Sequence, residues 1–338
     1  MQGDLLSRPD VVEQIRQALD YPQLDIATAV ASGELVAAAT PPPGFTTLVQ
    51  LSPDTIVAIA RSLRYRHFYY REDVAAIDAY ERRGGRSFPE ILAILRANTY
   101  ANAFSDAKIA GSYLGKAYGY DMLARAYMGQ VIAMRRDMTA HFHHFFVQHI
   151  LRESLTRDID CVFDLGSGKG DILAELAASA GRPDVQFIGG ELAEHGRACL
   201  DRFAGMLGMR NLRSAPFDMR APDFSVLAGF KNVLLISHYA LVYLNPFRES
   251  FWRAAFATTP AVRATLLEPV SFSVPELTNR PLFKLRQARD FGQAENFIEV
   301  LRNLQGSGEL RITEIVPDIS GLSALSSLSL VRFEKTPP

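Results

Sequence analysis

The sequence predicts an α/β protein in which a doubly wound, mostly parallel sheet follows an α-helical N-terminal region. Helical periodicity dominates residues 1–155, and from Ile159 onward short apolar, strand-like runs alternate with helical segments. A glycine-rich turn joins the first of these strands to the helix that follows it, as in parallel βαβ units. We therefore expect two parts, a helical region at 1–155 and an α/β domain at 156–338.

Composition and charge exclude several classes of protein. With 338 residues, of which 48% are hydrophobic and 22% charged, the chain has the profile of a globular protein rather than a disordered one. A net charge of −1 gives no positive excess for nucleic acid or an anionic membrane surface. No apolar run reaches the ~18 residues of a membrane helix, and the start MQGDLLSRPD does not resemble a secretory signal.

The two cysteines indicate a reducing compartment. Cys161 and Cys199 lie inside apolar periodic segments and lack the spacing of a metal site or a disulfide framework. We therefore expect a cytoplasmic protein with no nucleic-acid or membrane partner.

The N-terminal region contains several helical patterns and one clear break. The break is the run TPPPG at 40–44, which cannot be helix or inner strand and predicts a linker. Ser52-Pro53 has the form of an N-cap followed by proline at the first helical position. Helices are expected over 9–20, 23–39, 52–64, Arg71–Arg82, Phe88–Phe104, Asp106–Tyr118 and Asp121–Glu153, with no strand among them.

The second part alternates strands and helices before ending in a hairpin. Strands are expected over Ile159–Phe163, Val185–Gly189, Leu212–Pro216, Asn232–Ser237 and Arg263–Glu268, and helices over Asp171–Ala180, Leu192–Leu207, Pro246–Thr258 and Phe283–Leu304. The last two strand-like runs, Glu309–Val316 and Leu328–Phe333, are separated by a predicted loop that contains Asp318 and Gly321. Their spacing predicts an antiparallel hairpin.

The run DLGSGKG at 164–170 carries the clearest functional signal. Glycines at alternate positions let the backbone turn tightly and let a ligand approach the peptide groups. The dinucleotide fingerprint would need a third glycine at position 171, but the residue there is Asp171, whose charge repels phosphate. Asp164, two positions before the first glycine, is well placed for an ammonium group. Together these features point to an amino-acid-bearing nucleoside.

On this motif the sequence resembles the class I S-adenosylmethionine-dependent methyltransferases, whose first motif is an acidic residue followed by G-x-G-x-G. The resemblance covers about residues 155–335 and implies a Rossmann-like, seven-stranded sheet with an antiparallel last strand. It implies that Glu191 binds the ribose hydroxyls and that Asp218 and Met219 lie against adenine. The donor site expected on this basis comprises Asp164, Gly166, Ser167, Gly168, Gly170, Glu191, Leu192, Asp218, Met219 and Ser237.

The loop after the fourth strand of the α/β part is the expected acceptor side, because ligands bind at the carboxyl ends of strands in such sheets. His238 has an ordinary pKa suited to removing a proton near neutral pH, and Tyr239 or Tyr243 could orient a nucleophile. The alternative is a structural histidine that packs on the adenosyl group. The family's N/D-P-P-Y/F signature is absent here, which disfavours nucleic-acid bases and glutamine amides as acceptors.

A histidine-rich helix precedes the first strand of the α/β part. His141 and His144 share a helix face at i and i+3, where they could line a substrate cavity or lie on the helix surface. With His238 they could instead hold a metal ion, although no H-E-x-x-H spacing accompanies them and this is the lesser expectation. In the run 113–120, glycines interrupt the helix, so Tyr113 and Tyr118 are expected in a lid that contacts substrate.

The resulting hypothesis is an S-adenosylmethionine-dependent methyltransferase that transfers a methyl group to oxygen, nitrogen or carbon of a small molecule in specialised metabolism. The resemblance further implies that the helical region builds the acceptor pocket and supports a homodimer. One alternative is metal-assisted C-methylation of a 2-oxo acid, in which a metal would stabilise the enolate. The others are an NAD-dependent oxidoreductase and a non-catalytic protein that binds S-adenosylmethionine.

Overall fold

The computed structural model describes residues 69–103, 122–128, 130–274, 292–321 and 327–337, together with the single residues 9, 13 and 65. The chain divides into two compact units, Met1–Arg71 and Glu72–Pro338, and the fold described here is that of the second unit. Several predicted segments lie outside the described residues apart from those single positions: the helices at 9–20, 23–39, 52–64 and 106–118 and the linker at 40–44.

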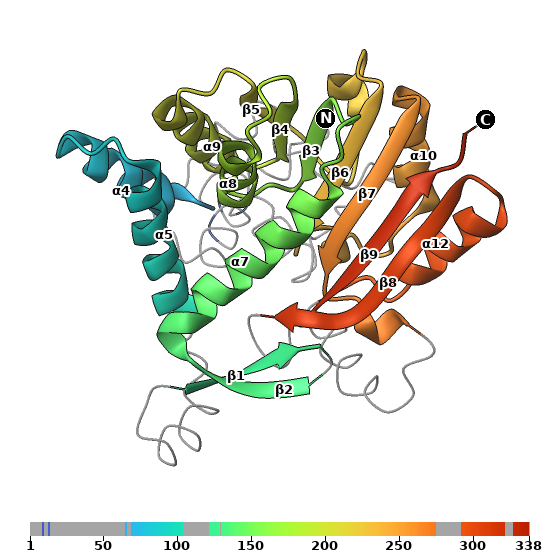
Figure 1. Ribbon diagram of the computed structural model, residues 1–338, viewed down its shortest axis with the longest axis horizontal. Helices are drawn as coiled ribbons and strands as arrows, with labels where there is room; N and C mark the ends of the chain where they lie inside the picture. The colour runs from blue at the N-terminus through green and yellow to red at the C-terminus, as the bar shows by residue number, and fades with distance from the viewer. Residues whose placement is uncertain are drawn as a thin grey trace. The chain divides into compact units, whose positions relative to one another are not determined.

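A mixed sheet forms the centre of the second unit, with the strand order β2-β1-β8-β9-β7-β6-β3-β4-β5 in the described part of the chain (Figure 1). Its strands are β1 Met122–Tyr127, β2 Gln130–Arg135, β3 Cys161–Leu165, β4 Gln186–Glu191, β5 Leu212–Pro216, β6 Asn232–His238, β7 Ala261–Glu268, β8 Leu310–Gly321 and β9 Ser327–Lys335. The five strands from β3 to β7 pair in parallel, whereas β9 is antiparallel to both β7 and β8. This order confirms the predicted doubly wound fold with a closing hairpin.

The central strands are apolar on both faces because helices cover the sheet on both sides. Along β3 and β6, successive residues alternate between two hydrophobic clusters. Phe163 and Leu235 belong to one cluster, and Val162 and Leu234 belong to the other. All four side chains are buried, as expected for strands in the middle of a parallel sheet.

Two groups of helices cover these faces. The first cluster includes residues of α10 Glu249–Thr258 and α12 Phe297–Gly306, and the second includes residues of α4 Arg71–Arg82, α5 Phe88–Ala103, α7 Arg136–Ser154, α8 Asp171–Ala180 and α9 Glu194–Leu207. Figure 1 shows α7 crossing the sheet on the side of α8 and α9, opposite α12. Short 3-10 turns lie at η2 Phe224–Leu227, η3 Leu241–Tyr243 and η4 Ser271–Ser273. No helix among the described residues has both the length and the apolarity required to cross a bilayer.

The predicted helix over Asp121–Glu153 is wrong in its first half. Residues 122–135 form the antiparallel hairpin β1–β2, and Tyr127 pairs with Ser320 so that the hairpin extends the sheet beyond β8. The segment is rich in alanine, methionine and arginine, which favour helix, but pairing with an existing strand edge overrides that preference. The helix α7 begins only at Arg136.

The loop predicted around Asp318 and Gly321 is also wrong, because β8 continues through both residues. The pairing of β8 with β9 is irregular between Val316 and Ser320, and Asp318 has a φ of 55° within this irregular stretch. A bulge of this kind absorbs a left-handed residue without ending the strand. Turn-forming residues therefore marked a bulge here instead of a loop.

Candidate functional site

The glycine loop lies at the carboxyl end of β3 and has the strained geometry that its sequence predicts. Gly166, Gly168 and Gly170 have φ angles of 77°, 59° and 77°, a region that other residues rarely adopt. A Cβ on Gly166 would lie 2.8 Å from the Cβ of Ala240. The N–H groups of Gly166 and Ser167 donate to the carbonyl of Gly190 at 2.9 and 3.0 Å, which holds the loop against β4.

Glu191 ends β4 with a buried carboxylate whose position is fixed by backbone donors. Its Oε2 accepts the N–H of Gly168 at 2.8 Å and its Oε1 accepts the N–H of Ala193 at 2.7 Å. Arg197 donates to the carbonyls of Glu191 and Leu192 at 2.9 and 2.7 Å, so the turn into α9 is held as well. A carboxylate oxygen can accept more than one hydrogen bond, so Glu191 can still accept ligand hydroxyls.

Asp164 is a buried acid near the carboxyl end of β3, beside β4. The pKa of Asp164 is raised to about 8, mainly by burial and in addition by the negative charges of Glu191, Asp171 and Glu268. An adjacent cation would reverse this shift, because an opposite charge stabilises the ionised carboxylate. The chemistry of Asp164 therefore suits a ligand ammonium group.

Two further donor-site candidates differ in what their hydroxyl groups do. The Oγ of Ser167 is buried and has no hydrogen-bond partner among the described residues, so it can serve a ligand. The hydroxyl of Ser237 instead donates to Glu268 and lies 3.4 Å from the carbonyl of Leu165. Ser237 is therefore occupied within the protein.

The residues after β5 lie against the glycine loop. The Cε of Met219 is 3.1 Å from the position that a Cβ on Gly166 would take. Asp218 accepts the backbone N–H of Arg220 at 3.0 Å and pairs with its guanidinium at 3.1 Å. Met219 is thus in contact distance of the loop, as an adenine-covering residue requires, and Asp218 stands beside it in the chain.

The sequence analysis missed Glu268, which shapes the loop after β6. Its buried carboxylate accepts the N–H groups of Ala240 and Leu241, each at 3.0 Å, and that of Val242 at 3.3 Å. Burial raises the pKa of Glu268, while its hydrogen bonds act in the opposite direction. An acid at the carboxyl end of a predicted parallel strand was the available signal.

On the expected acceptor side the rings of His238 and Tyr239 lie close together, and Tyr243 is exposed. His238 ends β6, and its ring lies 4.9 Å from that of Tyr239, measured between centroids. Tyr239 has a φ of 55°, a strained value for an aromatic residue at the point where the chain leaves the strand. Tyr243 lies in η3 with 54% of its surface exposed.

His238 lies within hydrogen-bond distance of His143 of α7, a residue that had not been identified from the sequence. Their Nε2 atoms are 3.0 Å apart. Burial lowers the pKa of His238 to about 4, and the charge of Asp171 acts in the opposite direction. His238 is therefore neutral near pH 7, and it is a weaker base than the ordinary histidine expected from the sequence, although its neutral ring still presents a lone pair.

His144 faces a different set of residues. Its Nδ1 lies 3.0 Å from Nη2 of Arg96, which also donates to Glu175 at 2.6 Å. Burial lowers the pKa of His144 to about 3. His144 also lines a pocket of about 160 Å³ together with Arg96, Phe145, Gln148, His149, Arg152 and Glu175.

The metal site that was the lesser expectation for His141, His144 and His238 gains no support from the described side chains. His238 pairs with His143 rather than His144, and no group of three His, Cys, Asp or Glu among the described residues is arranged to hold a metal ion. His141 lies in α7, with its side chain outside the described set. Tyr113 and Tyr118 also lie outside the described residues.

Comparison with known proteins gave matches to solved structures alone. No family model and no curated protein matches the sequence. A methyltransferase from Aquifex aeolicus described as dependent on S-adenosylmethionine (SAM) shares 14% identity at a TM-score of 0.38, covering 56% of this chain and 89% of that chain. Magnesium protoporphyrin IX methyltransferase (ChlM) from Synechocystis PCC 6803, with bound SAH, shares 13% identity at a TM-score of 0.41, and the match covers 60% of this chain and 86% of that chain. The O-methyltransferase NcsB1 from neocarzinostatin biosynthesis shares 17% identity at a TM-score of 0.39, and the match covers 60% of this chain and 58% of that chain.

Proposed function

We propose that this chain is a class I S-adenosylmethionine-dependent methyltransferase that acts on a small-molecule acceptor. The observation that carries the proposal is a pair of buried carboxylates, Asp164 and Glu191, on neighbouring parallel strands around a loop of left-handed glycines. The parallel pairing from β3 to β7 and the antiparallel β9 support the same assignment, because the resemblance implies a Rossmann-like sheet with an antiparallel last strand.

The chemistry of the donor set fits S-adenosylmethionine. Glu191 suits the ribose hydroxyls, Asp164 suits the ammonium group, and the buried Oγ of Ser167 supplies a polar atom that no described residue uses. Gly166 allows close approach of the ligand where any side chain would collide. When bound, the sulfonium compound supplies an electrophilic methyl group, and the protein's contribution is alignment and a base.

An NAD-dependent oxidoreductase is less well supported by the same residues. Asp171 opens α8, where a dinucleotide's pyrophosphate would approach the helix N-terminus. Burial acts to raise the pKa of Asp171, but nearby positive charge, including that of Lys169 and Arg96, outweighs burial and the pKa lies below its usual value. The ionised carboxylate would repel a pyrophosphate.

The acceptor side is proposed from the residues around the loop after β6. His238 is the proposed base and Tyr239 the proposed orienting residue, which favours a catalytic protein over one that only binds the nucleoside. Tyr243, Tyr113, Tyr118, His141 and His144 remain proposals for contacts with the acceptor. We also propose that residues 1–155 help to enclose the acceptor, that two chains associate, and that the enzyme works in the cytoplasm in specialised metabolism.

Calorimetric titration of the purified protein with S-adenosylmethionine, S-adenosylhomocysteine and NAD tests the proposed function. We expect micromolar affinity for both adenosyl compounds, about −8 kcal/mol, and no saturable binding of NAD. Tight binding of NAD without binding of S-adenosylhomocysteine would contradict the proposal. Light scattering on the same sample gives the mass that tests association of two chains.

A further inference from the structure

The pair formed by His143 and His238 joins two elements that are remote in the sequence. His143 lies on α7 and His238 at the end of β6, 95 positions later in the chain. Their rings are 5.2 Å apart between centroids and inclined at 44°, and the side chain of His143 is buried. Both rings also lie near the ring of Tyr239, at 6.4 and 4.9 Å.

The chemistry of imidazole restricts how this pair can be protonated. A contact of 3.0 Å between two Nε2 atoms is a hydrogen bond only when one nitrogen carries the proton and the other presents its lone pair. If Nε2 of His238 is the donor, its Nδ1 is left with a lone pair. If His143 is the donor instead, Nδ1 of His238 carries a proton and cannot act as a base.

We propose that His143 is a positioning residue whose Nε2 accepts the Nε2–H of His238, so that Nδ1 of His238 is kept as the proton acceptor of the active site. This proposal rests on the proposed function. His143 would then do for His238 what a hydrogen-bond acceptor does for many catalytic histidines, which is to select one tautomer and one ring orientation.

This arrangement supports methyl transfer coupled to removal of a proton from the acceptor. The proton of the acceptor's hydroxyl or amine moves to Nδ1 of His238, and the electron pair left on the acceptor atom forms the new bond to the methyl carbon. The electron pair of the broken carbon–sulfur bond remains on sulfur, and His238 later returns its proton to water.

The charged groups around the pair are compatible with a transient imidazolium. Asp171 of α8 raises the proton affinity of His238. The positive charges of Lys169 in the glycine loop and Arg96 of α5 lower the pKa of Asp171, which keeps Asp171 ionised. A negative charge is therefore maintained near His238 when it accepts a proton.

Nitrogen-15 NMR of histidine-labelled protein tests the tautomer without knowledge of the acceptor. Long-range proton–nitrogen spectra distinguish Nδ1–H from Nε2–H, and His238→Gln assigns the signals of His238. Between about pH 5 and pH 8, where a free imidazole titrates, we expect one neutral Nε2–H tautomer for His238. A mixture of tautomers, or the Nδ1–H form, would overturn the proposal.

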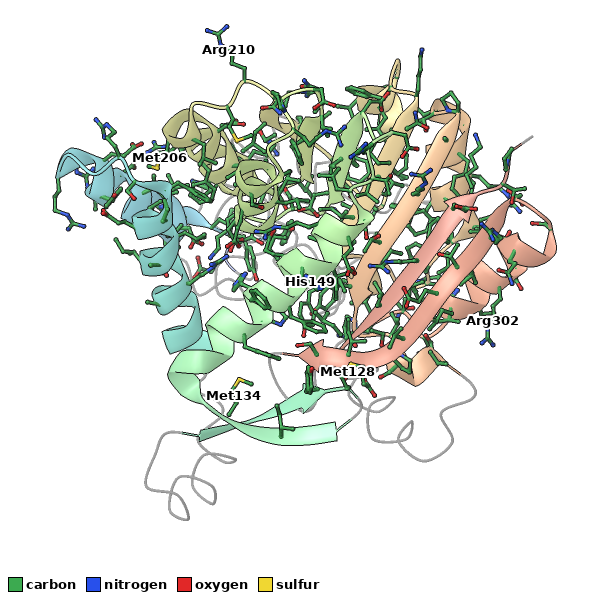
Figure 2. The ribbon with its side chains drawn as sticks, viewed as in Figure 1. Met128, Met134, His149, Met206, Arg210 and Arg302 are labelled. Atoms are coloured by element: carbon green, nitrogen blue, oxygen red, sulfur yellow. The ribbon has the colours of Figure 1, made fainter. Side chains whose placement is uncertain are left out.

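Three variants separate positioning from a structural role. His143→Phe should abolish the single tautomer, whereas His143→Gln, whose amide can accept at the same place, should retain it. His149→Phe is the matched control, because His149 lies on the same helix with 63% of its side chain exposed (Figure 2) and should leave the signals of His238 unchanged. An unchanged tautomer in His143→Phe would refute the role of His143.

Two further readouts keep this inference distinct from the proposed function. All three variants at positions 143 and 149 should bind S-adenosylhomocysteine as the parent does. Failure of the parent to bind would contradict the proposed methyltransferase function but not the assigned tautomer of His238. Near-stoichiometric metal in the parent that disappears in His143→Phe would overturn the hydrogen-bonded pair. With an acceptor identified, His143→Phe should lower kcat by about tenfold or more with little change in KM for the donor.

Discussion

The proposed donor edge, which comprises residues 164–170 and Glu191, and the histidine pair, His143 and His238, are built in opposite ways. At the donor edge, a single run of seven residues, 164–170, supplies the acid and the three left-handed glycines, and Glu191 follows after one helix. The histidine pair instead requires α7 to cross the sheet so that His143 reaches the end of β6. Local backbone geometry specifies the first region, whereas tertiary packing alone specifies the second.

This difference explains which functional features are visible in a sequence. A φ of 77° at Gly166 constrains the residue type at that position, so the motif carries its own signature. A hydrogen bond between His143 and His238 constrains nothing in the neighbouring sequence. Substitutions in one region or the other should therefore have distinct effects on ligand affinity and on the free energy of unfolding.

The largest effect is expected at Glu268, which holds the loop beside the histidine pair through long-range contacts. Glu268→Ala removes the acceptor from Ser237 and from the N–H groups of Ala240 and Leu241. Because unsatisfied buried donors are costly, we expect the free energy of unfolding in urea to fall by about 3 kcal/mol or more. The control Glu309→Ala removes a partly exposed ion pair with Arg253 and should change the free energy of unfolding by about 0–1 kcal/mol. Equal losses would contradict the role of Glu268.

The next effect concerns ligand affinity at the donor edge. Asp164→Ala and Glu191→Ala should each weaken binding of S-adenosylhomocysteine by about 10-fold to 100-fold, since each removes a charge-assisted hydrogen bond of about 1.5–3 kcal/mol. Calorimetric titration gives the affinities. Asp201→Ala is a suitable control, because Asp201 is an exposed acid whose carboxylate accepts from Ser214 away from the loop. Unchanged affinity in both variants would remove the donor site from this edge.

A third effect is the pH dependence contributed by Asp164 in the free protein. Its pKa of about 8 when folded exceeds the ordinary value of 3.8, so between these values the folded chain binds more protons than the unfolded chain. Stability therefore falls as pH rises through this window, and the loss is complete above pH 8. Asp164→Asn should raise the free energy of unfolding by about 1–3 kcal/mol at pH 8 and by little near pH 4. Urea titrations at several pH values measure the difference, and a gain that shrinks as pH rises would contradict the assigned shift.

The smallest effect separates close approach from backbone strain. Gly166 and Gly181 both have left-handed φ angles, 77° and 61°, but a Cβ at Gly166 would meet Ala240 whereas nothing lies within 4 Å at Gly181. Both alanine substitutions carry strain, and Gly166→Ala should lose about 1–2 kcal/mol more on thermal or urea unfolding because of overpacking. It should also weaken binding of S-adenosylhomocysteine, which Gly181→Ala should not. Equal behaviour of the two variants would argue against close approach at Gly166.

Most of the sheet could be predicted from the sequence because buried parallel strands have a distinctive pattern. The runs that form β3, β4, β6 and β7 are short, apolar and separated by segments of helical periodicity, so the succession of strands and helices along the chain could be predicted. The hairpin β1–β2 was missed because its residues favour helix by themselves and form strands only against β8. Bounds such as the end of β8 depended on a bulge that the residue types do not distinguish from a turn.

The candidate site divides along the same line. Asp164 and the glycines were predicted from the motif at 164–170, and Glu191 from the resemblance to the methyltransferases. The structure places them together at the carboxyl ends of β3 and β4. Glu268 and His143 were missed, because each acts through contacts with residues 26 to 95 positions away. His144 was expected to line a substrate cavity or lie on the helix surface, with a shared metal site as the lesser alternative, and its Nδ1 lies 3.0 Å from Arg96.

A crystal structure of the protein with S-adenosylhomocysteine would show directly whether the ligand binds at the edge formed by Asp164, Gly166 and Glu191. We expect the ribose hydroxyls within hydrogen-bond distance of the carboxylate of Glu191, the ligand ammonium beside Asp164, and the ligand against Gly166. A ligand bound elsewhere, with Glu191 and Asp164 making no contact to it, would contradict the assignment of this edge as the donor site.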